Sequence, residues 1–132
     1  MKNILYILTA FLVFSCSPPD NSHTALISDF HPPQWIQGTW KQELFGLDSR
    51  TGFKFSANDL CTLIGVAEHC QQEIIDSQRK SGTNVIVEEV ITSTSYSVKI
   101  SSSGQQKTFS FQKISDTKIE WNSDSAIELL KK

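Results

Sequence analysis

The stretch SYSVKIS, residues 95–101, decides the fold class of this chain. Its apolar residues Tyr96, Val98 and Ile100 alternate strictly with serine and lysine residues. Because successive side chains of a β-strand point to opposite faces, this alternation is typical of a strand with one buried and one solvated face. Strands of that kind belong to antiparallel sheets. The stretch therefore predicts an antiparallel β-strand.

Runs with the same period lie on both sides of this stretch. KTFSFQKI (107–114) places Phe109 and Phe111 in phase, and TGFKFSA (51–57) does the same with Phe53 and Phe55. With a strand from Trp40 to Phe45, we count seven or eight candidate strands. The remaining candidates are LCTLIG (60–65), VIVEEVI (85–91), KIEW (118–121) and AIELL (126–130). Short runs at such spacing predict a mainly β protein, either a small antiparallel barrel or a strongly curled meander.

Turn-forming residues separate these runs, as a meander requires. Serine, aspartate, asparagine and glycine favour turns because they tolerate or stabilise non-extended backbone. The four turn signals are Leu47-Asp48-Ser49-Arg50, Ser102-Ser103-Gly104, Ser115-Asp116 and Asn122-Ser123-Asp124.

One segment departs from the strand pattern. In VAEHCQQEIIDSQRKSG (66–82), Val66, Cys70 and Ile74 recur at intervals of four residues and share one helical face. An acidic residue near the start and basic residues near the end suit the helix dipole. The segment predicts one inserted helix over about 66–80, packed across an opening or edge of the sheet.

A short motif opens the folded part of the chain. Gly38-Thr39-Trp40 follows a turn-prone Pro-Pro-Gln-Trp segment, and the glycine allows the chain to turn sharply before the tryptophan. The motif resembles the Gly-x-Trp opening of the lipocalin-like (calycin) barrels. The resemblance implies that Trp40 begins the first strand and plugs the closed end of a lipocalin-like β-barrel domain, residues 29–132. Such families often cover this tryptophan with a late arginine. No arginine follows Arg79 here, so Lys118 or another group is expected to cover it.

The same resemblance implies that the domain acts by binding, with either a small apolar ligand or an envelope partner. For most of the candidate lining residues we expect plain core packing, with ligand lining as the alternative role. About eight strands enclose only packed side chains or one small ligand, so we expect a mostly filled interior. The candidate lining residues are Phe53, Phe55, Tyr96, Val98, Phe109 and Phe111.

The beginning of the chain predicts targeting to the cell envelope. Residues 4–14 are apolar except for Thr9. A membrane-spanning helix needs about 20 such residues, whereas the apolar region of a signal peptide needs about 7–15. Residues 1–15 are therefore interpreted as a signal peptide.

Val13-Phe14-Ser15-Cys16 resembles the lipobox of bacterial lipoproteins. The resemblance implies cleavage before Cys16 and acyl chains on that cysteine, which anchor the protein in a membrane. Residues 16–28 then form the lipidated N-terminus and an extended, proline-containing tether. Since Ser17 is not an aspartate, we expect the outer membrane. The alternative is an ordinary secreted protein with a spare cysteine.

Cys61 and Cys70 remain after Cys16 is assigned. In an oxidising envelope an even pair suggests a disulfide, and closing so short a loop contributes about 2–3 kcal/mol. The alternative is two reduced thiols that face the core. A metal site with His69 would need the spacing Cys-x₇-His-Cys, which is not a standard zinc pattern. We predict no metal.

Charge and motif content exclude other classes. The chain has 12 lysines and arginines against 14 acidic residues, and they form no basic stripe for nucleic acid. Adjacent Glu88 and Glu89 would point to opposite faces of a strand, and no histidine lies in a motif that would activate a serine. We expect neither catalysis nor a cofactor. The alternative to ligand binding is a protein inhibitor whose exposed loop enters its target, or a passive assembly subunit of the envelope.

Overall fold

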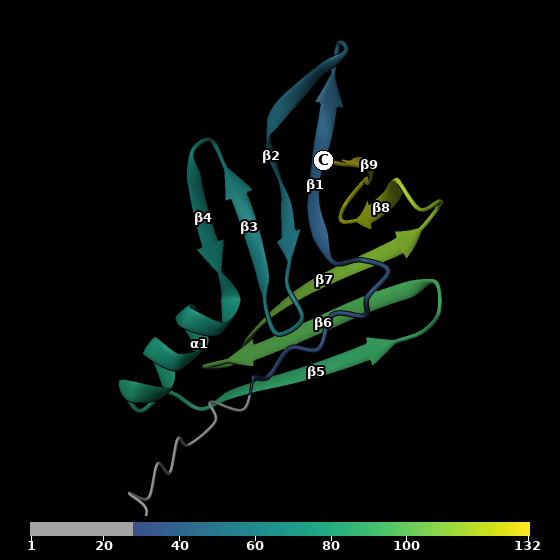
Figure 1. Cartoon of the computed structure of the whole chain (residues 1–132). Coiled ribbons are helices and arrows are strands. Elements are labelled where there is room, and N and C mark those ends of the chain that lie inside the picture. Colours follow the sequence, from purple (N-terminus) through teal and green to yellow (C-terminus); the bar gives the residue numbers. More distant parts are fainter. Residues whose placement is uncertain (1–27) are drawn as a thin grey trace, which may run out of the picture.

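The computed structural model describes residues 28–132, which form one antiparallel sheet of nine strands and one helix (Figure 1). The strand order is β4-β3-β2-β1-β9-β8-β7-β6-β5. Only β1 and β9 are neighbours that do not follow each other directly along the chain. The strands are β1 (Gly38–Leu44), β2 (Leu47–Phe55), β3 (Leu60–Ile64), β4 (Ala67–Cys70), β5 (Val85–Ile91), β6 (Ser95–Ser102), β7 (Gln105–Lys113), β8 (Lys118–Asn122) and β9 (Ala126–Lys131).

The sheet is strongly curled, so that β5, β6 and β7 run across β1–β4 and enclose the core between them (Figure 1). The helix α1 (Gln71–Lys80) links β4 to β5, the two edge strands, and packs against β3, β4 and β5. The predicted fold class, a mainly β curled meander with one inserted helix at an edge, is confirmed.

The start of the predicted helix is wrong. Residues 67–70 form the strand β4, which pairs with β3 through Cys61 opposite Cys70 and Thr62 opposite His69. Gly65, with φ 65°, makes the turn between these strands. Strand pairing and the cross-link fix the backbone before Gln71, and this tertiary pairing overrides the local helical period. It also supplies the ninth strand.

The first hairpin also turns earlier than the sequence indicated. Residues 47–50 belong to β2, and the turn is Phe45-Gly46, with φ values of 55° and 77°. Leu44 pairs with Leu47 across this two-residue turn. The turn signals at Ser102-Ser103-Gly104, Ser115-Asp116 and Asn122-Ser123-Asp124 do separate successive strands.

Trp40 lies fully buried at the start of the sheet. Its Nε1 donates a hydrogen bond of 2.6 Å to the carbonyl oxygen of Ile36. Gly38 has φ 123°, a conformation that favours glycine. The Nζ of Lys131 lies 5.3 Å from the centre of the Trp40 ring. Lys131 therefore covers the tryptophan, while Lys118 binds Glu128.

The segment before β1 is tied to the helix and to β5. Asp29 accepts two hydrogen bonds from Arg79, of 2.6 and 2.9 Å, and this guanidinium holds the pKa of Asp29 below its usual range. Phe30 and Ile36 of the segment are fully buried in the core. The segment is thus bonded to α1 and packed into the core, and it is part of the domain.

The structure does not describe the residues before Ser28. The signal peptide 1–15, the lipidation of Cys16 and nearly all of the tether 16–28 therefore lie outside the described residues. In residues 28–132, no helix is both long enough and apolar enough to cross a bilayer.

Candidate functional site

The six residues predicted to line a ligand cavity come together as a packed core. None of them is more than 4% exposed. Phe111 lies between Phe53 and Phe55, with a distance of 5.0 Å between ring centres in each case and near-perpendicular rings. Tyr96 and Phe109 stand beside them, at 6.1 Å from Phe55 and Phe53 respectively. Side chains therefore fill this part of the interior, and the aromatic rings pack edge to face, an arrangement that aromatic pairs prefer.

Space for a ligand lies next to this core, where α1 faces the hairpin of β6 and β7. A cavity of about 530 Å³ opens there. Its walls combine isoleucines with amide and hydroxyl groups and one lysine. The lining residues are Gln71, Ile74, Ile75, Gln78, Thr83, Ile100, Ser102, Ser103, Gln105, Gln106 and Lys107. None of the six predicted lining residues is among them, and we call this cavity the helix groove.

Among the described residues, Lys107 is the one cation that lines the helix groove. It is in phase with Phe109 and Phe111 on β7 and lies directly opposite Ile100 on β6, so its side chain leaves the sheet on the same face as the core. Its Nζ lies 4.6 Å from the ring centre of Phe109, and partial burial lowers the pKa of Lys107. In the described part of the chain no carboxylate pairs with it. The residue as a whole is exposed, so its ammonium is accessible to an anion in the groove.

Amide groups stand on the helix side of the groove. Gln71 is only 4% exposed, and its Nε2 donates a weak hydrogen bond of 3.4 Å to the carbonyl oxygen of His69. Gln78 accepts a hydrogen bond of 3.3 Å from the Ser102 hydroxyl, which ties α1 to β6. The groove thus offers a cation and amides beside an apolar wall of Ile75 and Ile100.

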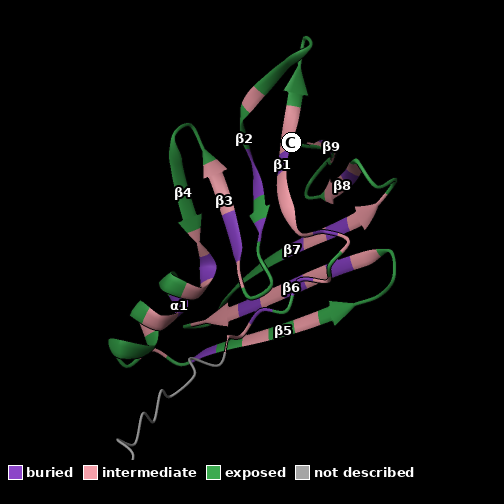
Figure 2. Ribbon diagram, viewed as in Figure 1, coloured by how far each residue is buried: buried purple, intermediate pink, exposed green. Residues whose placement is uncertain are grey.

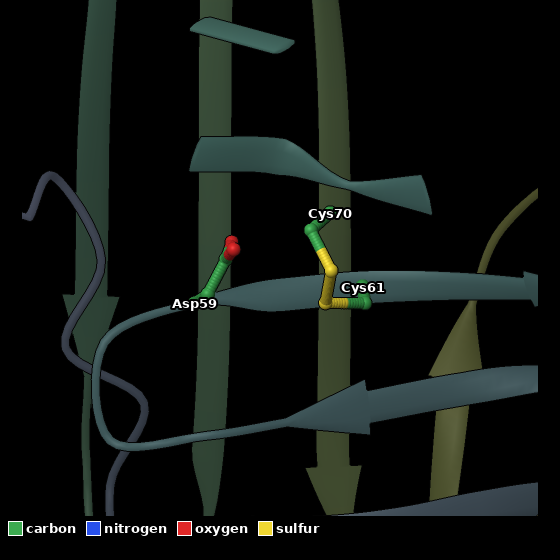
Figure 3. Close-up of side chains that lie close together, drawn as sticks. All are labelled: Asp59, Cys61 and Cys70. Carbon is green, nitrogen blue, oxygen red and sulfur yellow. A yellow bond between two sulfur atoms is a disulfide. The ribbon is translucent and has the colours of Figure 1, made fainter. Parts of the chain in front are cut away.

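A second cluster lies at the start of α1, where Asp59, Cys61 and Cys70 meet (Figure 3). Their ligand atoms lie within 4.8 Å of one another, a spacing that would suit a metal ion. The structure joins the two sulfur atoms in a disulfide bond, so neither offers a thiolate, the form that binds metal. Only the Asp59 carboxylate remains as a ligand.

Asp59 has a structural task instead. Cys70, the residue that precedes α1, makes no side-chain cap. Asp59 replaces it from a neighbouring turn: its carboxylate accepts hydrogen bonds from the backbone N–H of Gln72 at 3.0 Å and of Leu60 at 2.7 Å. Unpaired N–H groups at a helix start favour such an acceptor, although burial raises the pKa of Asp59. The cluster therefore fixes α1 to β3.

A third group of polar residues was not found from the sequence. The hydroxyl of Tyr96 donates to Glu89 at 2.6 Å, and Glu89 also accepts from the backbone N–H of His31 at 2.8 Å. The Nδ1 of His31 lies 2.9 Å from the other carboxylate oxygen. Burial is the main reason why the pKa of Tyr96 lies above its usual range. This network holds the segment before β1 against β5.

One feature of the sequence marks Glu89 and Lys107, the two charged residues that the sequence analysis did not select. Glu89 is in phase with the inward residues Val85 and Val87 of β5, and Lys107 is in phase with the inward aromatic residues of β7. A charged side chain in the buried phase of a strand needs a partner. Glu89 has its partners in Tyr96 and His31, whereas Lys107 has an open groove.

No protein-family model, curated protein or solved structure matches this chain.

Proposed function

We propose that this domain binds a small amphipathic molecule with an anionic head and an apolar chain, such as a fatty carboxylate, in the helix groove. The observation that carries the proposal is Lys107, in the inward phase of β7 at the wall of a 530 Å³ cavity, with no carboxylate partner among residues 28–132. This function belongs to the ligand-binding class that the sequence led us to expect. The proposed site lies beside the aromatic core, whose interior is filled by side chains.

The groove offers a polar region for the head of such a ligand and an apolar region for its chain. The Lys107 ammonium and the Gln71 amide would receive the anionic head, because charge-assisted hydrogen bonds are the stronger ones. Ile75 and Ile100 offer an apolar wall to the chain. The cavity volume lies within the range of about 300–1,000 Å³ that is usual for ligand sites.

Replacing Lys107 by methionine tests this assignment. Using the chain from residue 17 onward, we expect Lys107→Met to weaken binding of dodecanoate about tenfold, since one charge-assisted hydrogen bond contributes roughly 1.5 kcal/mol. Methionine keeps most of the apolar stem, so binding of dodecanol should change little. Titration calorimetry measures both affinities.

Lys99→Met is the matched control. Lys99 lies on the neighbouring strand β6, on the opposite face, where it pairs with Glu88. The control removes the same charge from the protein but leaves the groove intact, so dodecanoate affinity should be retained. Equal losses in both variants, or no dodecanoate binding by the unaltered chain, would contradict the proposal.

We further infer that the protein is held at the bacterial cell envelope, in the outer membrane, by acyl chains on Cys16. The lipobox-like Val13-Phe14-Ser15-Cys16 supports this. Intact-mass analysis of the protein from its own cells should show a chain that begins at Cys16 and carries the mass of two or three acyl chains. A mass that includes Met1, or an unmodified Cys16, would refute the anchor.

A further inference from the structure

The hairpin of β1 and β2 extends beyond the rest of the sheet. β9 pairs with β1 only at Trp40 and Lys41, and β3 reaches β2 only as far as Thr51. Residues 42–49, which we call the arm, therefore form backbone pairs only with each other within the described residues, since the carbonyl oxygen of Arg50 still accepts a hydrogen bond from the N–H of Gly65. At about 3.4 Å per residue the arm projects roughly 10 Å past its neighbours (Figures 1 and 2).

The end of the arm is apolar and exposed. Leu44 is 49% exposed, Leu47 is 73% exposed and the Phe45 side chain is completely exposed. An isolated two-stranded ribbon is only marginally stable in water, and Phe45 and Leu47 bury little surface that would support it. A cluster of exposed apolar groups marks an interaction site.

Phe45 is also unfavourable for the turn itself. Its φ of 55° lies in the left-handed region, where bulky side chains are rare. The same chain shows the usual solution at the turn between β6 and β7, where Ser103 and Gly104 have φ values of 50° and 77°. A phenylalanine at this position weakens the hairpin, so its presence points to a role outside the fold.

Two carboxylates mark the base of this apolar end. Glu43 lies directly opposite Asp48, an arrangement that is repulsive across a strand pair. Asp48 is partly compensated by Lys132, whereas Glu43 has no ion pair among the described residues. This negative pair disfavours an anionic lipid surface, which attracts basic groups. It is complementary to lysine or arginine side chains on a protein.

We propose that the arm docks into a partner protein, placing Leu44, Phe45 and Leu47 in an apolar cleft whose rim carries lysine or arginine side chains. A narrow, convex ribbon fits a cleft better than a flat surface. The arm is separate from the helix groove, so this inference stands independently of ligand binding there.

Photo-cross-linking in the full-length protein, in intact cells, tests this proposal. A benzoyl-phenylalanine is placed at position 45 or 47, and at position 103 as the control in the matching turn of the other hairpin. We expect positions 45 and 47 to capture the same protein, with the adduct on an apolar cleft beside basic residues. Position 103 should not capture it.

The Phe45→Asn variant separates docking from folding. Asparagine tolerates the left-handed conformation, so the variant should unfold at a higher temperature. Capture from position 47 should nevertheless fall at least tenfold, and Glu43→Lys should also reduce it. Adducts with lipid, no adduct above the control position, or capture that persists in Phe45→Asn would each overturn the proposal. We expect dodecanoate binding to be unaffected in all these arm variants, because none of the changed arm residues lines the helix groove, so failure here leaves the groove assignment untouched.

Discussion

The Phe53→Ala variant is expected to lose about 3–5 kcal/mol of unfolding free energy, the usual loss when a buried phenylalanine is truncated. Phe53 is 1% exposed and joins the two halves of the curled sheet. Its ring centre lies 4.8 Å from that of Trp121 on β8 and 5.0 Å from that of Phe111 on β7. Truncation would leave a cavity between strands that are distant along the chain. Urea denaturation followed by tryptophan fluorescence measures the loss.

Phe45→Ala is the matched control, because it makes the same chemical change on the same hairpin. The Phe45 ring is completely exposed, so its removal should alter the unfolding free energy by no more than about 0.5 kcal/mol. A loss in Phe53→Ala as small as that expected for Phe45→Ala would show that Phe53 is not a core residue. The comparison also tests whether the arm contributes to stability.

The second large effect concerns the disulfide between Cys61 and Cys70. These residues are nine positions apart, and opening a loop of this size costs about 2.5 kcal/mol in the chain-entropy account. The Cys61→Ser/Cys70→Ser double variant should therefore unfold at a lower urea concentration than the unaltered protein. It also releases β4, the edge strand that leads into α1.

A reductant provides the control for this prediction. Reduction should bring the unaltered protein close to the double variant, while the variant itself should not respond to reductant. If the unaltered protein were equally insensitive, the two thiols would be reduced in the native state. That result would restore the cluster with Asp59 as a candidate thiolate site.

Every strand except β4 could be predicted, most clearly those whose apolar and polar residues alternate. In SYSVKIS the inward residues Tyr96, Val98 and Ile100 are all at most 8% exposed in the structure. The turn at Ser103-Gly104 was also evident, since serine and glycine both tolerate the conformation that the hairpin needs. These features depend only on residues that are close together along the chain, so they can be read directly from the sequence.

The predictions that failed depended on distant contacts. Val66, Cys70 and Ile74 have helical spacing, yet pairing with β3 places Cys70 at the end of a strand and leaves Val66 fully exposed in a turn. The Phe45-Gly46 turn was missed because phenylalanine is a poor turn residue. Its position is set by the register of β1 against β2, in which Trp40 faces Phe53.

The candidate site was also predictable only in part. The six proposed lining residues were correctly gathered on one face, but only the packed structure shows that their rings fill the space between the strands. The helix groove exists because α1 crosses from β4 to β5 beside the β6–β7 hairpin. Lys107 was visible in the inward phase of its strand, although only the three-dimensional structure shows that no carboxylate from Ser28 onward pairs with it.

The sequence alone determined that this chain is mainly β, an antiparallel barrel or a curled meander with one inserted helix, because the period-2 runs and most of the turns between them are local properties. Only the tertiary structure decided where the helix begins, which side chains fill the interior, and where a cation is left facing open space. Those outcomes depend on which distant strands pack together, because that packing decides which side chains are buried and which remain exposed.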